Sequence, residues 1–352
     1  MTELEKRLKD NEENLKAVEE AILMSSTGDE GFVLLKQQLE DEKKLLEEEM
    51  ARGGGQAQAA TGGTASPSPI QQEATSPSLE GAALPLDAQT LTKKGDDAYE
   101  RKDYAEAFRC YSKAAEQGYA DGQYCLGYCY YAGEGTAKDV AKAVELYRKA
   151  AEQGHAKAQR NFGNSCYDGE CVPLDKAKAV YWWTKAAEQG DFQAQSNLGV
   201  VYNNGEGVPQ DKAKAAYWYE KAAEQGDAQS QRFIGVYYAT GEGVAKDDAK
   251  AAYWFTKAAE QGDVYAQHNL GVSYSNGTGV PKDEAKAAYW YTKAAEQGHA
   301  GSQCIVGIYY EQGTGGLPKD LAKAVYWFTK SAAQGNADAQ KMLATLKQEG
   351  KV

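Results

Sequence analysis

The chain has 352 residues, of which 42% are hydrophobic, and a formal net charge of −12 at pH 7. Binding to nucleic acid requires clustered Lys and Arg, so this charge balance argues against a nucleic-acid-binding protein. No apolar run approaches the roughly 20 residues that span a bilayer, and the first twenty residues are too charged for a secretory signal. We therefore expect a cytoplasmic protein, with the nucleus as the alternative location, that has no membrane span and is not secreted.

Residues 1–50 predict two acidic helices, with 15 acidic and 7 basic side chains. The first of these helices carries apolar residues at heptad spacing, which predicts a coiled-coil seam. A helix of only three heptads is marginally stable alone, so this seam needs a partner. The partner is either the second helix, folded back as a hairpin, or a helix of another chain, such as a second copy. The seam of the first helix, which contains one polar residue, consists of Leu4, Leu8, Asn11, Leu15, Val18 and Ile22.

Residues 51–86 predict a disordered linker. This segment is rich in Gly, Ala, Ser, Thr and Pro and has few bulky apolar residues. It cannot bury enough apolar surface to offset the entropy lost on ordering.

From residue 87 onward the chain repeats itself. A period of this length is typical of stacked helix–turn–helix units, each too short to be stable alone. We therefore expect an all-α protein, a right-handed α-solenoid of such units. The hexapeptide KAAEQG recurs every 36 residues, and a variant, KSAAQG, follows the last copy after 37; they begin at Lys113, Lys149, Lys185, Lys221, Lys257, Lys293 and Lys330.

One repeat, residues 227–262, illustrates the predicted unit. Its first helix carries Gly235 at the centre of the apolar face, where a second helix can approach closely. Asp247 is suited to cap the second helix, and Gly262 ends that helix in a left-handed conformation. The Glu and Gln of KAAEQG are expected to face solvent. The apolar stripe of the second helix consists of Ala251, Trp254, Phe255, Ala258 and Ala259.

The pattern AQSNLGVVYNNGEGVPQDKAKAAYWYEKAAEQG, at 194–226, closely resembles the Sel-one-like repeat (SLR) family, whose members are relatives of tetratricopeptide repeats. Six full units of this kind cover 119–335. Residues 87–118 resemble a tetratricopeptide hairpin and are expected to cap the N-terminal end, and 336–352 to cap the C-terminal end. The resemblance implies a non-enzymatic adaptor or scaffold.

No constellation of residues indicates catalysis, a cofactor or a metal. The Gly-rich loops lack the strand and the Lys of a phosphate-binding loop, no Cys/His spacing predicts zinc, and the six cysteines indicate reduced thiols. His155 and His299 stand where other units have Asp, which predicts a helix-start role. In the second unit, Asn164 and Cys166 replace larger or more apolar residues, so weaker packing is expected there.

The concave face is the predicted binding surface. In superhelices of this kind the first helices line that face, and two positions beside their core stripe differ from unit to unit. Such positions either contact a ligand or are unconstrained surface. The candidate partner-binding residues are Arg160, Asn164, Ser196, Arg232, His268 and Cys304, with Val200, Val236, Val272 and Ile308 at the remaining positions.

The sequence thus predicts a scaffold that binds an extended or helical peptide in the concave groove, while residues 1–50 dimerise or dock a second partner. Three alternatives stay open. Some family members are subunits of ubiquitin-ligase or protein quality-control assemblies. Cysteine-rich relatives have been described as β-lactamase-like, although this chain lacks a Ser-x-x-Lys motif. Residues 15–49 resemble the N-terminal helices of Tudor-type nuclear splicing factors, although no Tudor domain follows.

Overall fold

The computed structural model divides into two compact units, Met1–Leu84 and Pro85–Val352. It describes residues 87–351 throughout and ten residues of the first unit, all of them helical: Glu5, Leu8, Lys9, Glu12, Leu15, Lys16, Glu40, Lys43, Lys44 and Glu47. The predicted linker, 51–86, and most of the predicted seam lie outside the described residues. Within the first unit, Lys43 Nζ lies 2.8 Å from a carboxylate oxygen of Glu12, which joins the two predicted helical segments.

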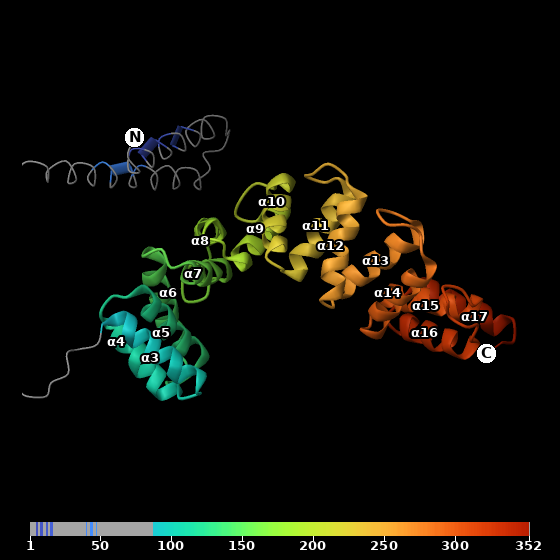
Figure 1. The fold of residues 1–352 in the computed structure, drawn as a ribbon, viewed down its shortest axis with the longest axis horizontal. Coiled ribbons are helices and arrows are strands. Elements are labelled where there is room, and N and C mark those ends of the chain that lie inside the picture. Colours follow the sequence, from blue (N-terminus) through green and yellow to red (C-terminus); the bar gives the residue numbers. More distant parts are fainter. Residues whose placement is uncertain are drawn as a thin grey trace, which may run out of the picture. The chain divides into compact units, whose positions relative to one another are not determined.

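The second unit is an α-solenoid, as predicted. Residues 87–351 form fifteen helices of 12 or 13 residues without a strand, and consecutive helices pack side by side into a curved stack (Figure 1). The helices are α3 (Ala88–Glu100), α4 (Tyr104–Glu116), α5 (Ala120–Ala132), α6 (Val140–Glu152), α7 (Ala156–Asp168), α8 (Lys176–Glu188), α9 (Phe192–Asn204), α10 (Lys212–Glu224), α11 (Ala228–Thr240), α12 (Asp248–Glu260), α13 (Val264–Asn276), α14 (Glu284–Glu296), α15 (Ala300–Gln312), α16 (Leu321–Ala333) and α17 (Ala337–Gln348).

Side-chain caps begin the helices where the sequence predicted them. Asp247 Oδ1 accepts a hydrogen bond of 3.0 Å from the amide of Lys250, which satisfies one of the four free amides of that helix start. His155 has the expected helix-start role, because its Nδ1 accepts from the amide of Ala158 at 3.1 Å. In the repeat 227–262, the second helix is followed by Gly262, whose φ of +93° is the left-handed conformation predicted for it.

The core of each repeat forms where a glycine of the first helix meets an aromatic ring of the second. A Cβ atom added to Gly235 would lie only 2.7 Å from the ring of Phe255, which confirms the predicted close approach. The small residues Ala251 and Ala258 of the second helix are 3% and 0% exposed beside this ring. The alternation of small and large side chains therefore allows the helices of a pair to pack closely.

The glutamine of KAAEQG is exposed, as expected, and it also makes hydrogen bonds that the sequence did not predict. Gln189 Nε2 donates to Oε1 of Gln159 at 2.8 Å, and Gln159 Nε2 donates to the carbonyl of Ala151 in the preceding repeat at 3.2 Å. Gln159 is 3% exposed, so its carboxamide needs these partners. Equivalent glutamine pairs join the helices of the other repeats.

Candidate functional site: the first-helix face

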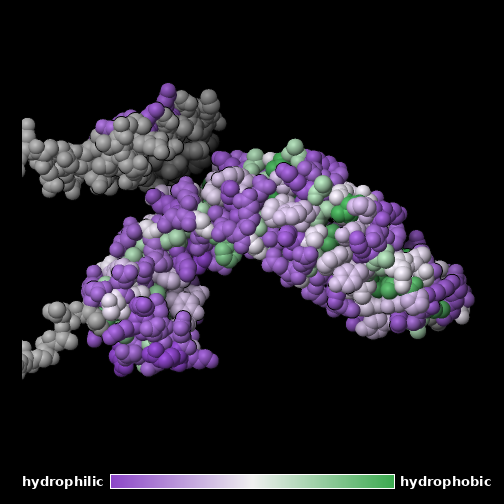
Figure 2. Space-filling model, in the orientation of Figure 1, coloured by the Kyte–Doolittle hydropathy of each residue, from purple (hydrophilic) through white to green (hydrophobic). Residues whose placement is uncertain are grey.

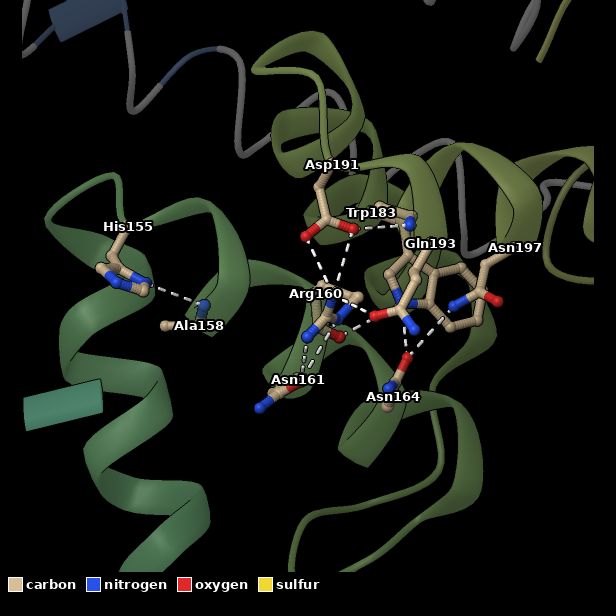
Figure 3. A network of polar contacts seen from close by, with 10 residues as sticks. His155, Ala158, Arg160, Asn161, Asn164, Trp183, Asp191, Gln193 and Asn197 are labelled. Atoms are coloured by element: carbon tan, nitrogen blue, oxygen red, sulfur yellow. Dashed lines mark hydrogen bonds and ion pairs between the residues drawn. The ribbon is translucent and has the colours of Figure 1, made fainter. Parts of the chain in front are cut away.

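The predicted binding residues Arg160 and Arg232 lie at the joints between repeats. Arg160 Nη1 lies 3.0 Å from a carboxylate oxygen of Asp191, the N-cap of the next first helix, and Figure 3 shows the two side chains facing each other. Arg232 Nε lies 3.1 Å from Asp263, the N-cap of α13. The two Arg side chains are 16% and 19% exposed. Each guanidinium is therefore committed to an ion pair that joins two repeats.

Ser196 and His268 occupy the same position in their repeats and contact the same kind of partner. Ser196 Oγ lies 3.5 Å from an oxygen of Asp227 and 3.0 Å from Ser230 Oγ. The ring of His268 lies 4.4 Å from the ring of His299, centroid to centroid. In these four joints the partner is the N-cap of the next first helix, which is Asp beside Arg160, Ser196 and Arg232 and is His299 beside His268.

Two further residues hold the same repeat position as Arg160, one in the first full repeat and one in the last. Tyr124 of α5 stacks on the imidazole of His155, with ring centroids 4.5 Å apart. Cys304 of α15 is 5% exposed and belongs to the core cluster that contains Phe328 and Ala339. A side chain this deeply buried presents almost no surface to a partner.

Burial keeps the capping imidazoles neutral. Desolvation, together with His299, lowers the pKa of His268 to about 4, and desolvation lowers the pKa of both His299 and His155. A helix cap by histidine requires an unprotonated Nδ1, because that atom must accept the backbone N–H. The neutral form is thus the one that holds the joint.

Asn164 bridges two repeats instead of weakening them. Its Oδ1 accepts from Trp183 Nε1 at 2.9 Å and from Asn197 Nδ2 at 3.2 Å (Figure 3). Trp183 stands where the other full repeats have Tyr or Phe, and its indole N–H requires an acceptor that an aliphatic residue would not supply. Cys166 of the same repeat is only 1% exposed.

A second row of variable residues follows the joint row by one position in each first helix. One residue along a helix is a rotation of about 100°, which moves a side chain away from the joint. The residues of this second row are all half-buried. Residues three positions further along each helix, which the sequence also predicted as binding positions, lie on the same helix face. We call this surface the first-helix face; it consists of Asn161, Asn164, Asn197, Val200, Phe233, Val236, Asn269, Val272, Ile305 and Ile308.

The part of the chain that the structure describes places no group of three or more His, Cys, Asp and Glu where it could hold a metal ion. In the same part, no helix is long and apolar enough to cross a membrane. Figure 2 shows more hydrophobic surface over α11 to α16 than over α3 and α4.

Comparisons with known proteins agree with the repeat architecture. A search of curated proteins finds no match. A protective antigen of uropathogenic Escherichia coli strains, which displays an SLR fold, is 39% identical with a TM-score of 0.70; the match covers 75% of this chain and only 57% of the antigen. A Sel1 repeat protein from Oxalobacter formigenes is 34% identical with a TM-score of 0.59, covering 68% of this chain and 96% of that protein.

The Sel1 repeat model matches seven consecutive segments, 93–119, 120–155, 156–191, 192–227, 228–263, 264–299 and 300–336. The first of these lies within the α3–α4 hairpin, where the sequence predicted a tetratricopeptide-like cap. Because the matches continue without a gap to α16, and the paired helices repeat with them, the chain belongs to the Sel1 repeat family.

Proposed function

We propose that this protein is a non-enzymatic scaffold that binds peptide segments of partner proteins along the first-helix face. Sel1 repeat proteins are generally protein-interaction scaffolds. The finer assignment, to this face, is supported by the partial exposure of its residues and by their variation between repeats. Arg160 and Arg232 of the joint row are held in ion pairs, whereas the contacts within the face, such as that of Asn197 with Asn164, are between neutral groups.

The observation that carries the proposal is a row of carboxamides beside a row of apolar residues. Asn161, Asn197 and Asn269 are half-buried and occupy equivalent positions, the first two in successive repeats and the third two repeats after the second. Val200 and Val272 lie three residues further along the same helices. A carboxamide both donates and accepts, so it matches the peptide group of an extended chain, while the Val side chains offer apolar contact.

The test uses the full-length protein and a random peptide library displayed on phage. Enriched peptides are synthesised and titrated against the wild type and the double variant Asn197→Ala, Asn269→Ala. Each hydrogen bond contributes about 0.5–1.5 kcal/mol, so the double variant is expected to bind about tenfold more weakly. Tyr217→Ala is the matched control, because Tyr217 is 53% exposed on a second helix. Equal binding by the double variant, or a loss with Tyr217→Ala alone, would assign the peptides to a different surface.

The N-terminal segment supplies a second contact in this proposal, through a homodimer or a partner helix. Its apolar seam needs a cover, and the Glu12–Lys43 ion pair favours a hairpin over an open helix as the unit that associates. Sedimentation equilibrium of the full chain and of a chain lacking residues 1–50 separates the two cases. A full chain that stays monomeric at micromolar concentration leaves the partner helix as the assignment.

A further inference from the structure

The first-helix face changes its character at the last full repeat. The position held by Asn161, Asn197 and Asn269 is Ile305 in α15, and the next position on the face is Ile308. Both Ile side chains are half-buried. Of the five repeats that make up this face, only this one has an aliphatic residue at both positions, so the face has an amide-rich end and an aliphatic end.

A hollow opens at the aliphatic end. It has a volume of about 390 Å³, at the lower limit of small-ligand pockets. This space fits one or two peptide side chains with their backbone, and is too small for a folded element. The hollow is lined by Glu284, Ile305, Ile308, Tyr309, Gln312 and Thr314.

One wall of the hollow carries a charge that selects the occupant. Tyr309, which is 8% exposed, donates its hydroxyl to Glu284 Oε2 at 2.7 Å, and Lys282 Nζ lies 3.1 Å from Oε1. These contacts, the tyrosine first, lower the pKa of Glu284, so the carboxylate is ionised at neutral pH. Each carboxylate oxygen can accept more than one hydrogen bond, and Glu284 is 43% exposed. The hollow thus combines apolar walls with a carboxylate that can accept a further hydrogen bond beside those of Tyr309 and Lys282.

We propose that this hollow anchors the partner peptide by a bulky aliphatic side chain, with an N–H donor of a neighbouring basic residue bound to Glu284. The inference rests on the proposed function. It adds a preference for particular side chains of the bound peptide and an orientation of that peptide along the first-helix face. The chain's own N-terminal helices fit less well, because residues 1–50 carry 15 acidic and 7 basic side chains and would bring negative charge to Glu284.

The test compares the library peptides on the wild type and on Ile305→Asn. This variant copies a residue that three other repeats hold at the same position, so the solenoid should keep its circular dichroism and its melting temperature. Peptides enriched on the wild type are expected to contain Leu, Ile or Met next to Arg or Lys, and to bind Ile305→Asn at least tenfold more weakly. Ile308→Val, which copies Val272, is the conservative control with a loss of threefold or less.

The possible failures are distinguishable. Peptides that lose affinity with Asn197→Ala but bind Ile305→Asn normally would overturn the anchor and leave the first-helix face intact. A library that yields no enriched peptide would overturn the proposed function, and the anchor with it. A wild-type dimer that Ile305→Asn dissociates would make a second copy the occupant and would also overturn the anchor.

Discussion

Mild acid is expected to weaken the joint between α13 and α15. There the rings of His268 and His299 lie 4.4 Å apart, and Ser302 Oγ lies 2.9 Å from Nδ1 of the first and 3.0 Å from Nδ1 of the second. The amide of Ser302 donates to Nδ1 of His299 at 3.1 Å. Tyr265 and Tyr291 are the ring neighbours of the pair, and burial raises the pKa of Tyr291 to about 12. Protonation therefore removes the helix cap and places two cations in contact.

The size of the effect follows from the pKa of His268. The folded protein lowers this pKa from 6.5 to about 4, so the unfolded chain binds the proton first as the pH falls. The contribution of His268 to the free energy of unfolding is constant above about pH 6.5, declines below it, and stops declining near pH 4. At pH 5 the difference corresponds to about 2 kcal/mol, which we reduce to about 1 kcal/mol because His268 keeps partial contact with solvent.

The matched variant is His268→Arg with His299→Asp, which copies the ion pair of Arg232 and Asp263 one joint earlier. Urea unfolding of the full-length protein, followed by circular dichroism at pH 7.5 and pH 5, gives the change in the free energy of unfolding for each chain. The wild type is expected to lose about 1 kcal/mol more than the double variant. His155 titrates in both chains and cancels in the comparison.

Equal losses in the two chains would refute this reasoning, because the variant has no imidazole at the joint. A larger loss in the double variant would be equally damaging. Because an array of repeats can unfold in parts, amide hydrogen exchange in α15 is the more local measurement. Faster exchange there at pH 5 in the wild type alone is the expected result.

Three other substitutions test the packing. Gly199→Ala is expected to cost about 1–3 kcal/mol in urea unfolding, because its Cβ would lie 2.5 Å from the ring of Tyr219; an unchanged midpoint would contradict the close approach. Cys171→Gly is expected to stabilise by about 1 kcal/mol, because Cys171 has a φ of +60°, and a lower melting temperature would count against backbone strain. Arg232→Ala is expected to cost about 1–2 kcal/mol, and a double-mutant cycle with Asp263→Ala should show coupling; strictly additive losses of stability would exclude an interaction between the two side chains.

The elements of the fold were predictable because their signals are local. The Asp or His that caps a helix, the Gly that follows it and the apolar stripe between them all lie within one repeat. Gly235 could be recognised for the same reason, since the ring that it contacts belongs to the next helix of its own unit. The N-cap role of His155 followed from comparing equal positions in successive units.

The joints were not predictable in this way. Arg160 pairs with Asp191 and Arg232 with Asp263, and both pairs are separated by 31 residues, while the repeat has a period of 36. When positions 36 residues apart are compared, Arg, Ser and His follow one another at the joint position. From this variation alone, contact with a ligand was inferred. A comparison of each residue with the one 31 positions later would have paired Arg160 and Arg232 with acidic residues.

The joint row and the first-helix face therefore vary for different physical reasons. Exchanging His268 for Arg changes the joint unless the next N-cap changes with it, because the two side chains are in contact across the repeat boundary. The position of Asn269 holds Ile305 one repeat later, so an aliphatic residue is accommodated there. A substitution at Asn269 can thus occur singly, whereas His268 depends on the N-cap that it contacts. This independence lets one solenoid present different surfaces to partners without rebuilding its core.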